Sequence, residues 1–415
     1  MRIRRAQMVA LAAGGCLLLS AGNAGAGVPA VRCGATITKS VTLSADLTNC
    51  PGTGLVVGAD GITLDLGGHT ISGTNAPGGE GIADDGHAGV QIRNGAISDF
   101  RLNGVGLRGA RRSIASGLVI RRIGAGGGEN DPVSAGILVK DSPGSQVVAN
   151  DVSNHVVAFQ SDGVDVLGSA ATVVSGNRLD NNNWDGLVLI ASPGSRVSAN
   201  ALSGNGNNGV EVNGASDSTS VTGNHADGNT QIGIVVGSGQ GMRVAGNSAK
   251  GNDTGLFFFD LHDSVIALNQ AAGNNDGLDL AGGQFGSDKN RVVANDASRN
   301  NISGIGIFGG ANDNVVTGNV ANGNRGSIGN GGGIVVQGST GNQLAWNVAN
   351  GNSDTGIVLL DDQPGDTTGN SVKGNTANQN RNHGIDAVAG SIDGGGNRAA
   401  GNAVPPQCIN VVCAG

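Results

Sequence analysis

Aromatic residues are nearly missing from this chain of 415 residues, which has 7 Phe, 2 Trp and no Tyr. Charged residues are also scarce, at 13%. The shortage of aromatics argues against a conventional core of large interlocking side chains. Disorder is the usual alternative for a chain with 77 Gly and 46 Asn, but Val, Ile and Leu recur at regular intervals. A periodic pattern in such a chain indicates a repeat architecture.

The apolar run near the start, MVALAAGGCLLL, is too short to be a membrane span. Arg2, Arg4 and Arg5 precede this run, and the small-residue stretch AGNAGAG follows it. That order is typical of a signal peptide over residues 1–26 that is cleaved after Ala26. The sequence therefore predicts a secreted or periplasmic protein without a membrane span.

Basic residues are the minority charge, with 24 Lys+Arg against 32 Asp+Glu. Removal of the predicted signal peptide takes away three arginines and leaves 21 basic residues against 32 acidic ones, a net charge of −11. An acidic protein of this kind is not expected to have nucleic acid as its main partner.

Cysteines are few outside the signal peptide and lie near the two ends of the chain, at Cys33, Cys50, Cys408 and Cys413. An even number of cysteines in an exported chain indicates disulfides. The local pairs Cys33–Cys50 and Cys408–Cys413 are more plausible than bridges that join the ends. No metal site is expected here, because no His or Cys lies at ligand spacing near either pair.

Two asparagines and a glycine repeat along the chain at intervals of 22 to 28 residues. The first asparagine of the motif is found at Asn150, Asn177, Asn200, Asn224, Asn247, Asn269, Asn295, Asn319, Asn347, Asn375 and Asn402. A second follows five residues later, from Asn182 to Asn380. The glycine is found at Gly136, Gly163, Gly186, Gly209, Gly233, Gly255, Gly277, Gly304, Gly333, Gly356 and Gly384.

The residues one and three places after each glycine are nearly always aliphatic, which predicts a strand with one buried face. A shorter apolar segment precedes each first asparagine, so each repeat offers about three short strands and no helical pattern. One such unit cannot bury its own apolar face, and the units must therefore stack as a parallel solenoid. Asparagine tolerates the left-handed backbone of a sharp corner, and its amide can form a ladder between coils. Glycine is expected to supply the other corners.

With its opening stretches CGATITKSVTLSADLTNC and GITLDLGGHTISG, the repeat resembles the right-handed parallel β-helix proteins, a group that includes pectate lyases, polygalacturonases and alginate epimerases. The resemblance covers about residues 33–403. It implies an all-β fold, a right-handed single-stranded parallel β-helix of about 13 to 14 coils with an Asn ladder, over residues 54–403. An N-terminal cap over 27–53 and a C-terminal tail over 404–415 would each hold one disulfide. The fold hosts many activities, so any function must come from departures from the repeat.

Catalytic motifs of the resembling families do not match this chain. Asp361, Asp362 and His383 follow the order of a polygalacturonase motif, but the acidic pair comes after its strand instead of before it. The catalytic Tyr of alginate epimerases has no counterpart, because the chain has no Tyr. Neither Arg178 nor Arg196, the arginines nearest in sequence, falls on the glycine-strand face that would bear the arginine base of a pectate lyase.

Departures from the repeat concentrate in residues 124–190. A long loop carries Glu129 and Asp131, and His155 replaces the second ladder asparagine. Asp162 and Asp185 precede the glycines of successive coils and should stack one strand apart, where like charges raise a pKa or require a cation. The remaining members of this candidate site are Asp165 and Trp184.

Three interpretations of this site stay open at the level of sequence. Asp162 and Asp185 could be acid–base catalysts, with His155 as proton carrier and Trp184 as a sugar platform. Glu129, Asp131 and Asp165 would then bind substrate. The resemblance to pectate lyases would instead imply that the carboxylates hold Ca²⁺. The third interpretation is a solvated acidic rim, which is favoured by a second pair, Asp276 and Asp279, that lacks a His or aromatic neighbour.

Two other outward-facing sets could meet a partner. Arginines gather in the early coils, at Arg93, Arg101, Arg108, Arg111, Arg112, Arg121 and Arg122, and could receive an anionic polysaccharide or pair with nearby acids. Apolar residues occupy outward strand positions at Val188, Ile190, Val235, Phe257, Phe259, Phe308, Val335, Val358 and Leu360. The sequence thus predicts a secreted protein that binds or acts on an extracellular, acidic polysaccharide, as a lyase or a hydrolase. The alternative is a non-catalytic envelope or adhesive protein that self-associates through its apolar strand face.

Overall fold

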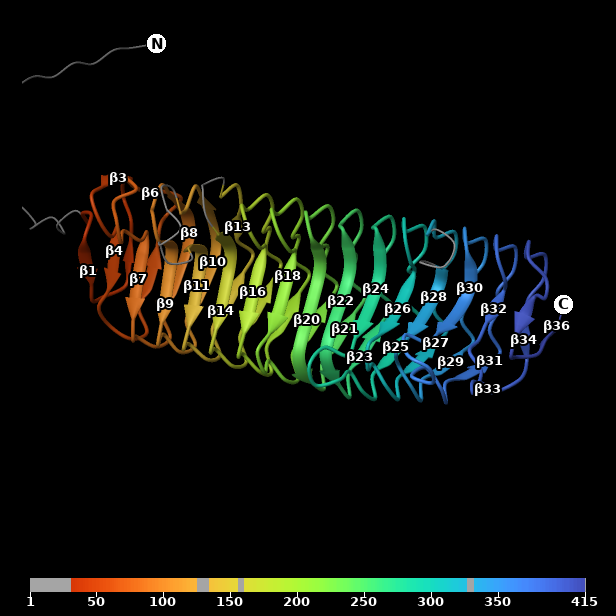
Figure 1. Cartoon of the computed structure of the whole chain (residues 1–415). Coiled ribbons are helices and arrows are strands. Elements are labelled where there is room, and N and C mark those ends of the chain that lie inside the picture. The colour runs from red at the N-terminus through yellow and green to blue at the C-terminus, as the bar shows by residue number, and fades with distance from the viewer. Residues whose placement is uncertain (1–30, 125–133, 156–159, 327–331, 415) are drawn as a thin grey trace, which may run out of the picture. The chain divides into compact units, whose positions relative to one another are not determined.

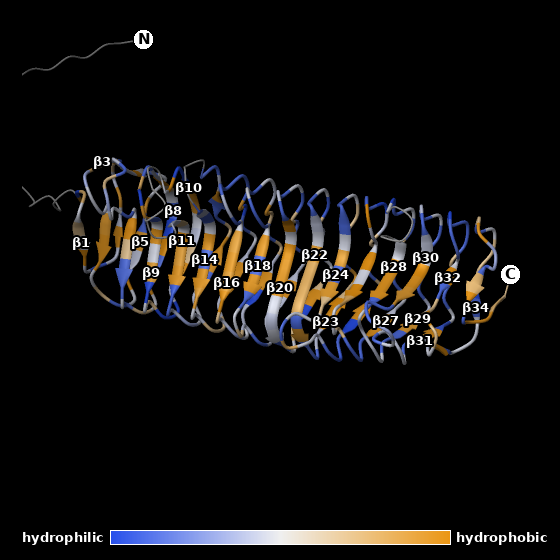
Figure 2. Ribbon diagram, viewed as in Figure 1, coloured by the Kyte–Doolittle hydropathy of each residue, from blue (hydrophilic) through white to orange (hydrophobic). Residues whose placement is uncertain are grey.

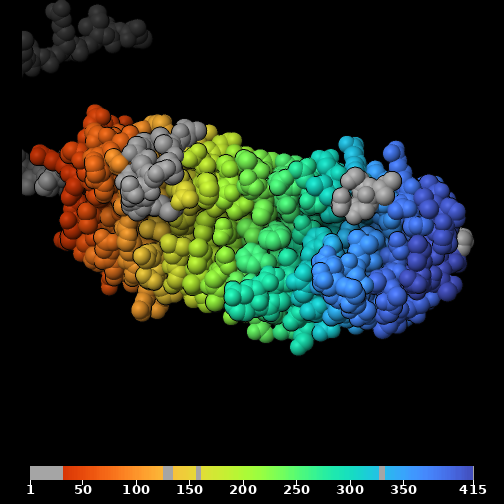
Figure 3. Space-filling view, in the orientation of Figure 1, coloured from red at the N-terminus to blue at the C-terminus, as the bar shows by residue number. Residues whose placement is uncertain are grey.

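The computed structural model describes residues 31–124, 134–155, 160–326 and 332–414. The chain divides into Met1–Val31 and Arg32–Gly415, and all of the described residues except Val31 belong to the second unit. This unit is a parallel β-solenoid whose coils follow one another in chain order (Figures 1 and 3). No helix in the described ranges is long and apolar enough to cross a membrane. The predicted signal peptide, residues 1–26, lies outside these ranges.

One face of the solenoid is a sheet of sixteen parallel strands, one from each coil, here called the long sheet. Its strands are, in order, β1 (Ala35–Ile37), β4 (Leu55–Val57), β7 (Ile82–Asp85), β9 (Asn103–Arg108), β11 (Ser134–Lys140), β14 (Ser161–Leu167), β16 (Leu187–Ile190), β18 (Val210–Asn213), β20 (Ile232–Gln240), β22 (Thr254–His262), β24 (Asp276–Ala281), β26 (Ile305–Phe308), β28 (Gly332–Gln337), β30 (Thr355–Leu360), β32 (Ile385–Asp386) and β35 (Cys408–Ile409). The predicted count of 13 to 14 coils was too low. The segments predicted as an N-terminal cap and a C-terminal tail also form coils, because β1 pairs with β4 and β35 pairs with β32.

A second face, here called the second sheet, is formed by the short strands that precede each first ladder asparagine. It contains β2 (Val41–Thr42), β5 (Thr63–Asp65), β8 (Gln91–Ser98), β10 (Ile114–Arg121), β12 (Gln146–Val148), β15 (Val173–Ser175), β17 (Arg196–Ser198), β19 (Ser220–Thr222), β21 (Arg243–Ala245), β23 (Val265–Ala267), β25 (Arg291–Val293), β27 (Val315–Thr317), β29 (Gln343–Ala345), β31 (Ser371–Lys373) and β33 (Ile392–Asp393). A third side contains β3 (Leu47–Cys50), β6 (Thr70–Gly73), β13 (Asp151–Val152) and a line of single bridges from Asp151 to Arg398. β34 (Asn397–Arg398) and β36 (Cys413–Ala414) pair at the C-terminal end.

The core is a column of small and medium aliphatic side chains. The residues one and three places after each motif glycine point inward, as Val210 and Val212 do in β18, and both are fully buried. Figure 2 shows hydrophobic residues concentrated in the strands and hydrophilic ones in the corners. Phe100 and Phe258 are the only aromatics among the largest fully buried side chains in the described ranges. The sequence prediction of a core without interlocking aromatics is therefore confirmed.

Two buried asparagine ladders join the coils at the corners, as the sequence predicts. In the first ladder Asn200 donates its main-chain N–H and its Nδ2 to Asn224 Oδ1, at 3.0 Å each, and Asn224 does the same to Asn247. The second ladder repeats this arrangement from Asn182 to Asn402. One assignment was wrong: Asn375 donates to Asn397, so Asn402 belongs to the second ladder and follows Asn380.

The residue with the left-handed backbone conformation is the one before each first-ladder asparagine, and not the asparagine itself as the sequence predicted. Ala199, Gly223 and Leu268, which precede first-ladder asparagines, have positive φ values of 54°, 63° and 58°. The ladder asparagines themselves do not have positive φ. The asparagine is thus needed for its amide, and the residue before it makes the bend.

The glycine that opens each long-sheet strand is required for space and not for its backbone freedom. Gly233 does not have a positive φ. A Cβ atom at this position would lie 2.6 Å from the carbonyl oxygen of Gly255 and 2.7 Å from Asn252 Nδ2. Adjacent coils therefore approach so closely beneath the second ladder that no side chain fits.

Serine hydroxyls and further asparagines form ladders at the remaining corners, which the sequence did not reveal. Ser142, Ser169 and Ser192 each donate a main-chain N–H to the serine hydroxyl of the next coil. Farther along the chain, Asn290, Asn314, Asn342 and Asn370 form an equivalent asparagine series. Each end carries one of the two predicted disulfides, Cys33–Cys50 and Cys408–Cys413.

Candidate functional site

The predicted carboxylates Asp162, Asp165 and Asp185 lie together at the long sheet, the first two on β14 and Asp185 in the corner before the adjacent strand β16. Asp185 donates its main-chain N–H to Asp162 Oδ1 at 2.8 Å, and Asn208 donates its own to Asp185 Oδ1 at 2.6 Å. Asn208 Oδ1 in turn accepts the N–H of Ile232 at 3.2 Å. Asp162 and Asp185 are therefore members of a side-chain ladder that continues with an asparagine.

Burial raises the pKa of all three carboxyl groups. The pKa of Asp162 lies well above its usual value, because the group is buried and Asp165 is close to it. Burial and the charge of Asp185 raise the pKa of Asp165 to about 7, against the hydrogen bond with Asp162, which lowers it. Burial and the charge of Asp162 raise the pKa of Asp185 to about 8. All three side chains are at most 5% exposed, so a bound substrate would not reach them in this conformation.

His155 lies inside the coil, where it replaces an asparagine of the second ladder. Its ring is fully buried, and Nδ1 lies 3.2 Å from the main-chain oxygen of Asp162 instead of its carboxylate. Burial lowers the pKa of His155 to about 4. Nε2 of His155 and Oδ1 of Asn182 both lack a hydrogen-bond partner within the described ranges, so the ladder is broken here. This position disfavours the predicted role of His155 as a proton carrier.

Of the other three predicted members of this site, the structure describes only Trp184. Trp184 precedes Asp185 and is 37% exposed, so its ring can meet solvent. Glu129 and Asp131 lie outside the described residues.

A Ca²⁺ ion does not fit the described part of this cluster. The described ranges contain no group of three or more His, Cys, Asp or Glu side chains arranged to hold a metal ion. Oδ1 of Asp162 and Oδ1 of Asp185 already accept main-chain N–H groups, which leaves each carboxylate fewer free lone pairs for a cation.

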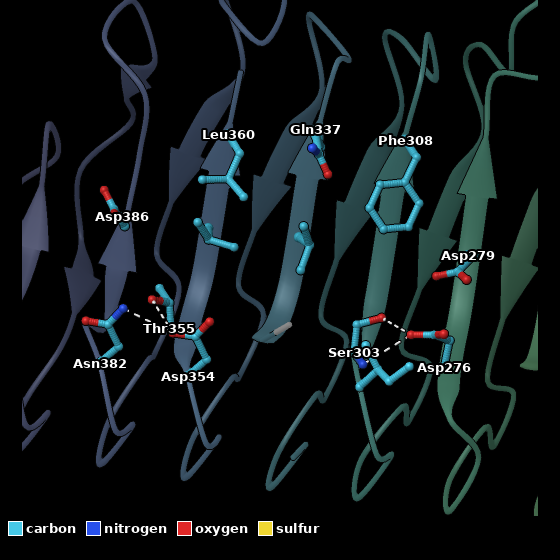
Figure 4. Close-up of a pocket in the computed structure, with 13 residues that line it drawn as sticks. Asp276, Asp279, Ser303, Phe308, Gln337, Asp354, Thr355, Leu360, Asn382 and Asp386 are labelled. Carbon is cyan, nitrogen blue, oxygen red and sulfur yellow. Dashed lines mark hydrogen bonds between the residues drawn. The ribbon is translucent and has the colours of Figure 1, made fainter. Parts of the chain in front are cut away.

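A pocket opens on the long sheet farther along the chain, across the adjacent strands β24, β26, β28, β30 and β32 (Figure 4). Its volume is about 320 Å³. Five parallel strands extend about 19 Å along the solenoid axis. The lining residues are Asp276, Asp279, Ile302, Ser303, Phe308, Val335, Gln337, Asp354, Thr355, Val358, Leu360, Asn382 and Asp386.

A glycine, Gly306, occupies an outward position on β26 between two pocket-lining residues. Gly306 pairs with Asp279 on one side and with Val335 on the other. The ring of Phe308 lies over Gly306, and a Cβ atom at Gly306 would collide with that ring and lie 2.5 Å from Asp279 Oδ1. Gly306 thus lets an aromatic ring and a carboxylate approach each other at the bottom of the pocket.

Carboxylates border the pocket at both ends, as Figure 4 shows. Asp276 accepts the hydroxyl of Ser303 at 2.8 Å, and Asp354 accepts Nδ2 of Asn382 at 3.0 Å. Oδ1 of Asp279 is buried without a hydrogen-bond partner. Burial, and then the charge of Asp276, raise the pKa of Asp279 to about 8. Burial also raises the pKa of Asp386. Among the described residues that line the pocket there is no Lys, Arg or His.

Several residues of this pocket were singled out from the sequence, but they were not predicted to form one site. Asp276 and Asp279 were thought to lack an aromatic neighbour, which is wrong, because Phe308 lines the same pocket from the adjacent strand β26. Counting two and four residues from the motif glycines places Asp279, Gly306 and Phe308 on one outward face. Asp354 and Asn382, which belong to the corners before β30 and β32, carry no such signal.

The outward apolar residues are more covered than the sequence suggested. Val188, Val235, Val335 and Val358 are each less than 10% exposed, and Ile190 reaches 37%. The other members of this set, Phe257, Phe259, Phe308 and Leu360, are half-buried.

The early arginines are largely neutralised by neighbouring acids. Arg93 pairs with Asp65, Arg108 with Glu80 and Asp85, Arg121 with Asp151, and Arg122 with Asp99. These pairs favour the interpretation that this set is structural over a role in receiving a polyanion.

The model of the family described as "Right handed beta helix region" matches residues 33–224, 128–271, 162–321 and 231–345. No curated protein sequence matches the chain. Among solved structures, the periplasmic alginate epimerase AlgG is 15% identical, covering 86% of this chain and 77% of its own, with a TM-score of 0.43. The A-module of the mannuronan C-5 epimerase AlgE6 from Azotobacter vinelandii is 14% identical, covering 92% and 91%, with a TM-score of 0.42. The Agl-KA catalytic domain is 12% identical, covering 92% and 61%, with a TM-score of 0.44. Likenesses this distant carry no information about activity.

Proposed function

We propose that this chain, which belongs to the right-handed β-helix family, binds a polysaccharide and hydrolyses it. The binding site in this proposal is the pocket between β24 and β32, on the outward face of the long sheet. The observation that carries this proposal is the combination of Phe308, an unpartnered carboxyl group on Asp279, and flanking carboxylates and amides in one elongated pocket. An apolar ring offers a surface to the face of a sugar, while carboxylates and amides accept and donate to its hydroxyl groups.

Asp279 is the proton donor in this proposal. A carboxyl group with a pKa of about 8 keeps its proton at neutral pH and can deliver it to a glycosidic oxygen. Asp276, whose negative charge helps to hold that proton, is the second carboxylate that such a reaction needs. Gln337, Asn382 and Asp354 would position the sugar chain through hydrogen bonds to its hydroxyl groups.

The charge of the pocket supports a neutral or amino-sugar polysaccharide over an acidic one. Four carboxylates and no basic residue line the pocket, so a uronate would meet repulsion there. Hydrolysis is favoured over elimination for the same reason, because a lyase must neutralise the carboxylate of its substrate. The sequence also allows an acidic substrate and lyase chemistry, and the experiment distinguishes both from hydrolysis of an uncharged substrate.

The predicted location also belongs to this proposal. Two disulfides support an oxidising compartment, in agreement with the signal-peptide pattern over residues 1–26. A polysaccharide outside the cell or in the periplasm would be accessible there.

The test is incubation of the mature protein with neutral, amino-sugar and uronate polysaccharides, with and without Ca²⁺. Reducing ends report hydrolysis, and ultraviolet absorbance of unsaturated ends reports elimination. We expect reducing ends alone, from a substrate that is not a uronate. Asp279→Asn should lower the rate by about 10²- to 10⁴-fold, and Phe308→Ala should weaken binding.

Asp162→Asn is the matched control, because an amide keeps the ladder acceptor at a position outside the pocket. Its activity should equal that of the unmodified protein. Activity that survives Asp279→Asn but is lost in Asp162→Asn would reject the pocket in favour of the buried cluster. Unsaturated ends from a uronate would reject hydrolysis, and absence of both binding and turnover would reject the proposal entirely.

A further inference from the structure

The outward face of the second sheet has a different character from the pocket face. Ten of its fifteen strands, β12, β15, β17, β19, β21, β23, β25, β27, β29 and β31, have three residues each, and in each the middle residue is buried while the first points outward. None of these strands contains an acidic residue, although the chain as a whole has a net charge of −8. This face lies on a different side of the coil from the long sheet.

Three arginines occupy one line on this face. Arg196, Arg243 and Arg291 are the first residues of β17, β21 and β25, and strand pairing places them in the same register. Ser220 and Val265, the first residues of the intervening strands, are uncharged. An arginine therefore appears on every second strand, at intervals of about 9.6 Å.

These three guanidinium groups have no ion-pair partner among the described residues, and all three side chains are exposed. The early arginines differ, because Arg93, Arg108 and Arg121 are paired with carboxylates. Small or hydroxyl-bearing residues surround the line, including Ser198, Thr222 and Ala245. Val265 and Val293 are the apolar outward residues along the line, and the unpaired guanidinium groups keep their capacity for bidentate binding.

We propose that this arginine line binds an extended anionic polysaccharide that carries one carboxylate or sulfate for every two sugar units. Each strand spacing is close to the advance of one pyranose unit in an extended chain, so alternate sugars would present their charge to successive arginines. Arginine binds carboxylate and sulfate groups through paired N–H donors. Ser220 and Thr222, between Arg196 and Arg243, would contact one uncharged sugar through their hydroxyls, and Val265, between Arg243 and Arg291, would pack against the next.

A nucleic acid fits this line less well. Its phosphates follow one another at about 3.4 Å along each strand of a duplex, much closer than the arginines. The remaining phosphates would lie against a protein with an excess of acidic residues. Arginines at intervals of about 9.6 Å are better matched to a polymer whose negative groups are spaced at a similar distance. This site is separate from the pocket and does not depend on the function proposed for it.

The test uses immobilised hyaluronate, which has one carboxylate for every two sugars, as the probe. Polygalacturonate with a carboxylate on every sugar, uncharged dextran and single-stranded DNA serve as comparison probes. Binding to hyaluronate should exceed binding to the other three and should weaken steeply as salt rises towards about 150 mM. The triple variant Arg196→Gln/Arg243→Gln/Arg291→Gln should lose at least about tenfold in affinity.

The matched control is Arg299→Gln/Arg325→Gln/Arg381→Gln, which removes the same charge from three exposed arginines elsewhere on the solenoid. It should bind hyaluronate as well as the unmodified protein. Equal losses in the two triple variants would show that net charge alone matters and would overturn the proposal. The proposal also fails if the unmodified protein does not bind hyaluronate, or binds DNA or polygalacturonate more tightly. Far-ultraviolet circular dichroism of each variant verifies that the fold is intact.

Discussion

At the scale of single residues, chemistry in this molecule is confined to positions where the repeat is altered. His155 interrupts the second ladder, Gly306 makes room for the ring of Phe308, and Asp279 places a carboxyl group in the pocket. The sequence analysis singled out His155 and Asp279 but not Gly306, and it did not show that His155 faces inward. His155 and Asp162 were grouped by proximity in sequence, whereas the structure buries both of them.

We predict that His155→Asn stabilises the protein. An asparagine can donate to the unpartnered Oδ1 of Asn182 and restore the ladder, which is worth about 1 kcal/mol in the free energy of unfolding. Burial lowers the pKa of His155 to about 4 in the folded protein. The stability that goes with the neutral, buried ring is therefore complete above the unfolded pKa of 6.5 and is lost as pH falls through about 4. The variant should therefore gain most at acidic pH, as measured by thermal unfolding at pH 5 and pH 7.

The same variant distinguishes the two candidate sites. If His155 carried protons in catalysis, His155→Asn would abolish turnover. We expect turnover to be unchanged. A less stable variant would contradict the account of the broken ladder.

A second prediction concerns the pH dependence of turnover. The pKa of Asp279 is raised to about 8, so the group is protonated below that pH and deprotonated above it. A general acid of this kind predicts that kcat/KM falls as pH rises, with a midpoint near 8. The measurement is a pH profile with the polysaccharide that the panel identifies.

Asp288→Asn, a change at a partly exposed carboxylate outside the pocket, is the control for that profile. It should leave the midpoint unchanged. A midpoint near 4, the range of an ordinary aspartate, would show that Asp279 is not the donor.

At the scale of the coil, the amide ladders and the close-packed glycines account for why this sequence forms this element. The period, the strands and the ladder asparagines could be predicted, because each depends on a local pattern repeated many times. The roles of two corner residues, Gly233 and Ala199, could not be predicted. Gly233 is fixed by a contact with Gly255 in the next coil, and the bend at Ala199 becomes visible only from its φ value. Serine ladders escaped notice because serine is common in loops of every kind.

We predict that Gly233→Ala destabilises the protein by roughly 1–3 kcal/mol through overpacking. The new Cβ would lie 2.6 Å from the carbonyl oxygen of Gly255 and 2.7 Å from Ala249 Cβ, so adjacent coils must separate. Gly52→Ala is the control, because a Cβ there meets no atom within 4 Å. Urea titration followed by circular dichroism measures both, and equal stability of the two variants would reject the close-packing explanation.

At the scale of the whole solenoid, the two ends are the places where coils lose a neighbour. The disulfides lie at these ends, and Cys33–Cys50 closes a loop with a sequence separation of 17, against 5 for Cys408–Cys413. The longer loop should contribute more, about 3 kcal/mol against about 2.

Cys33→Ser/Cys50→Ser should therefore loosen the N-terminal coils more than Cys408→Ser/Cys413→Ser loosens the C-terminal ones. Hydrogen exchange followed by mass spectrometry would locate the change at β1 and β4 in the first variant and at β32 and β35 in the second. Uniform loosening along all sixteen coils would contradict this expectation, since each coil of a solenoid contacts only its neighbours.

The sides of the solenoid also differ in charge, with a carboxylate-lined pocket on the long sheet and a line of arginines on the second sheet. Composition shows only the net charge of the whole chain. The pocket residues come from five coils, and their convergence depends on strand register, which a single sequence does not determine.

The most direct measurement is a crystal structure of Asp279→Asn soaked with an oligosaccharide of the polysaccharide that the panel identifies. Our account predicts sugar density between β24 and β32, with one ring against Phe308 and a glycosidic oxygen within hydrogen-bond distance of residue 279. Density elsewhere on the solenoid, or an empty pocket at saturating ligand, would contradict it.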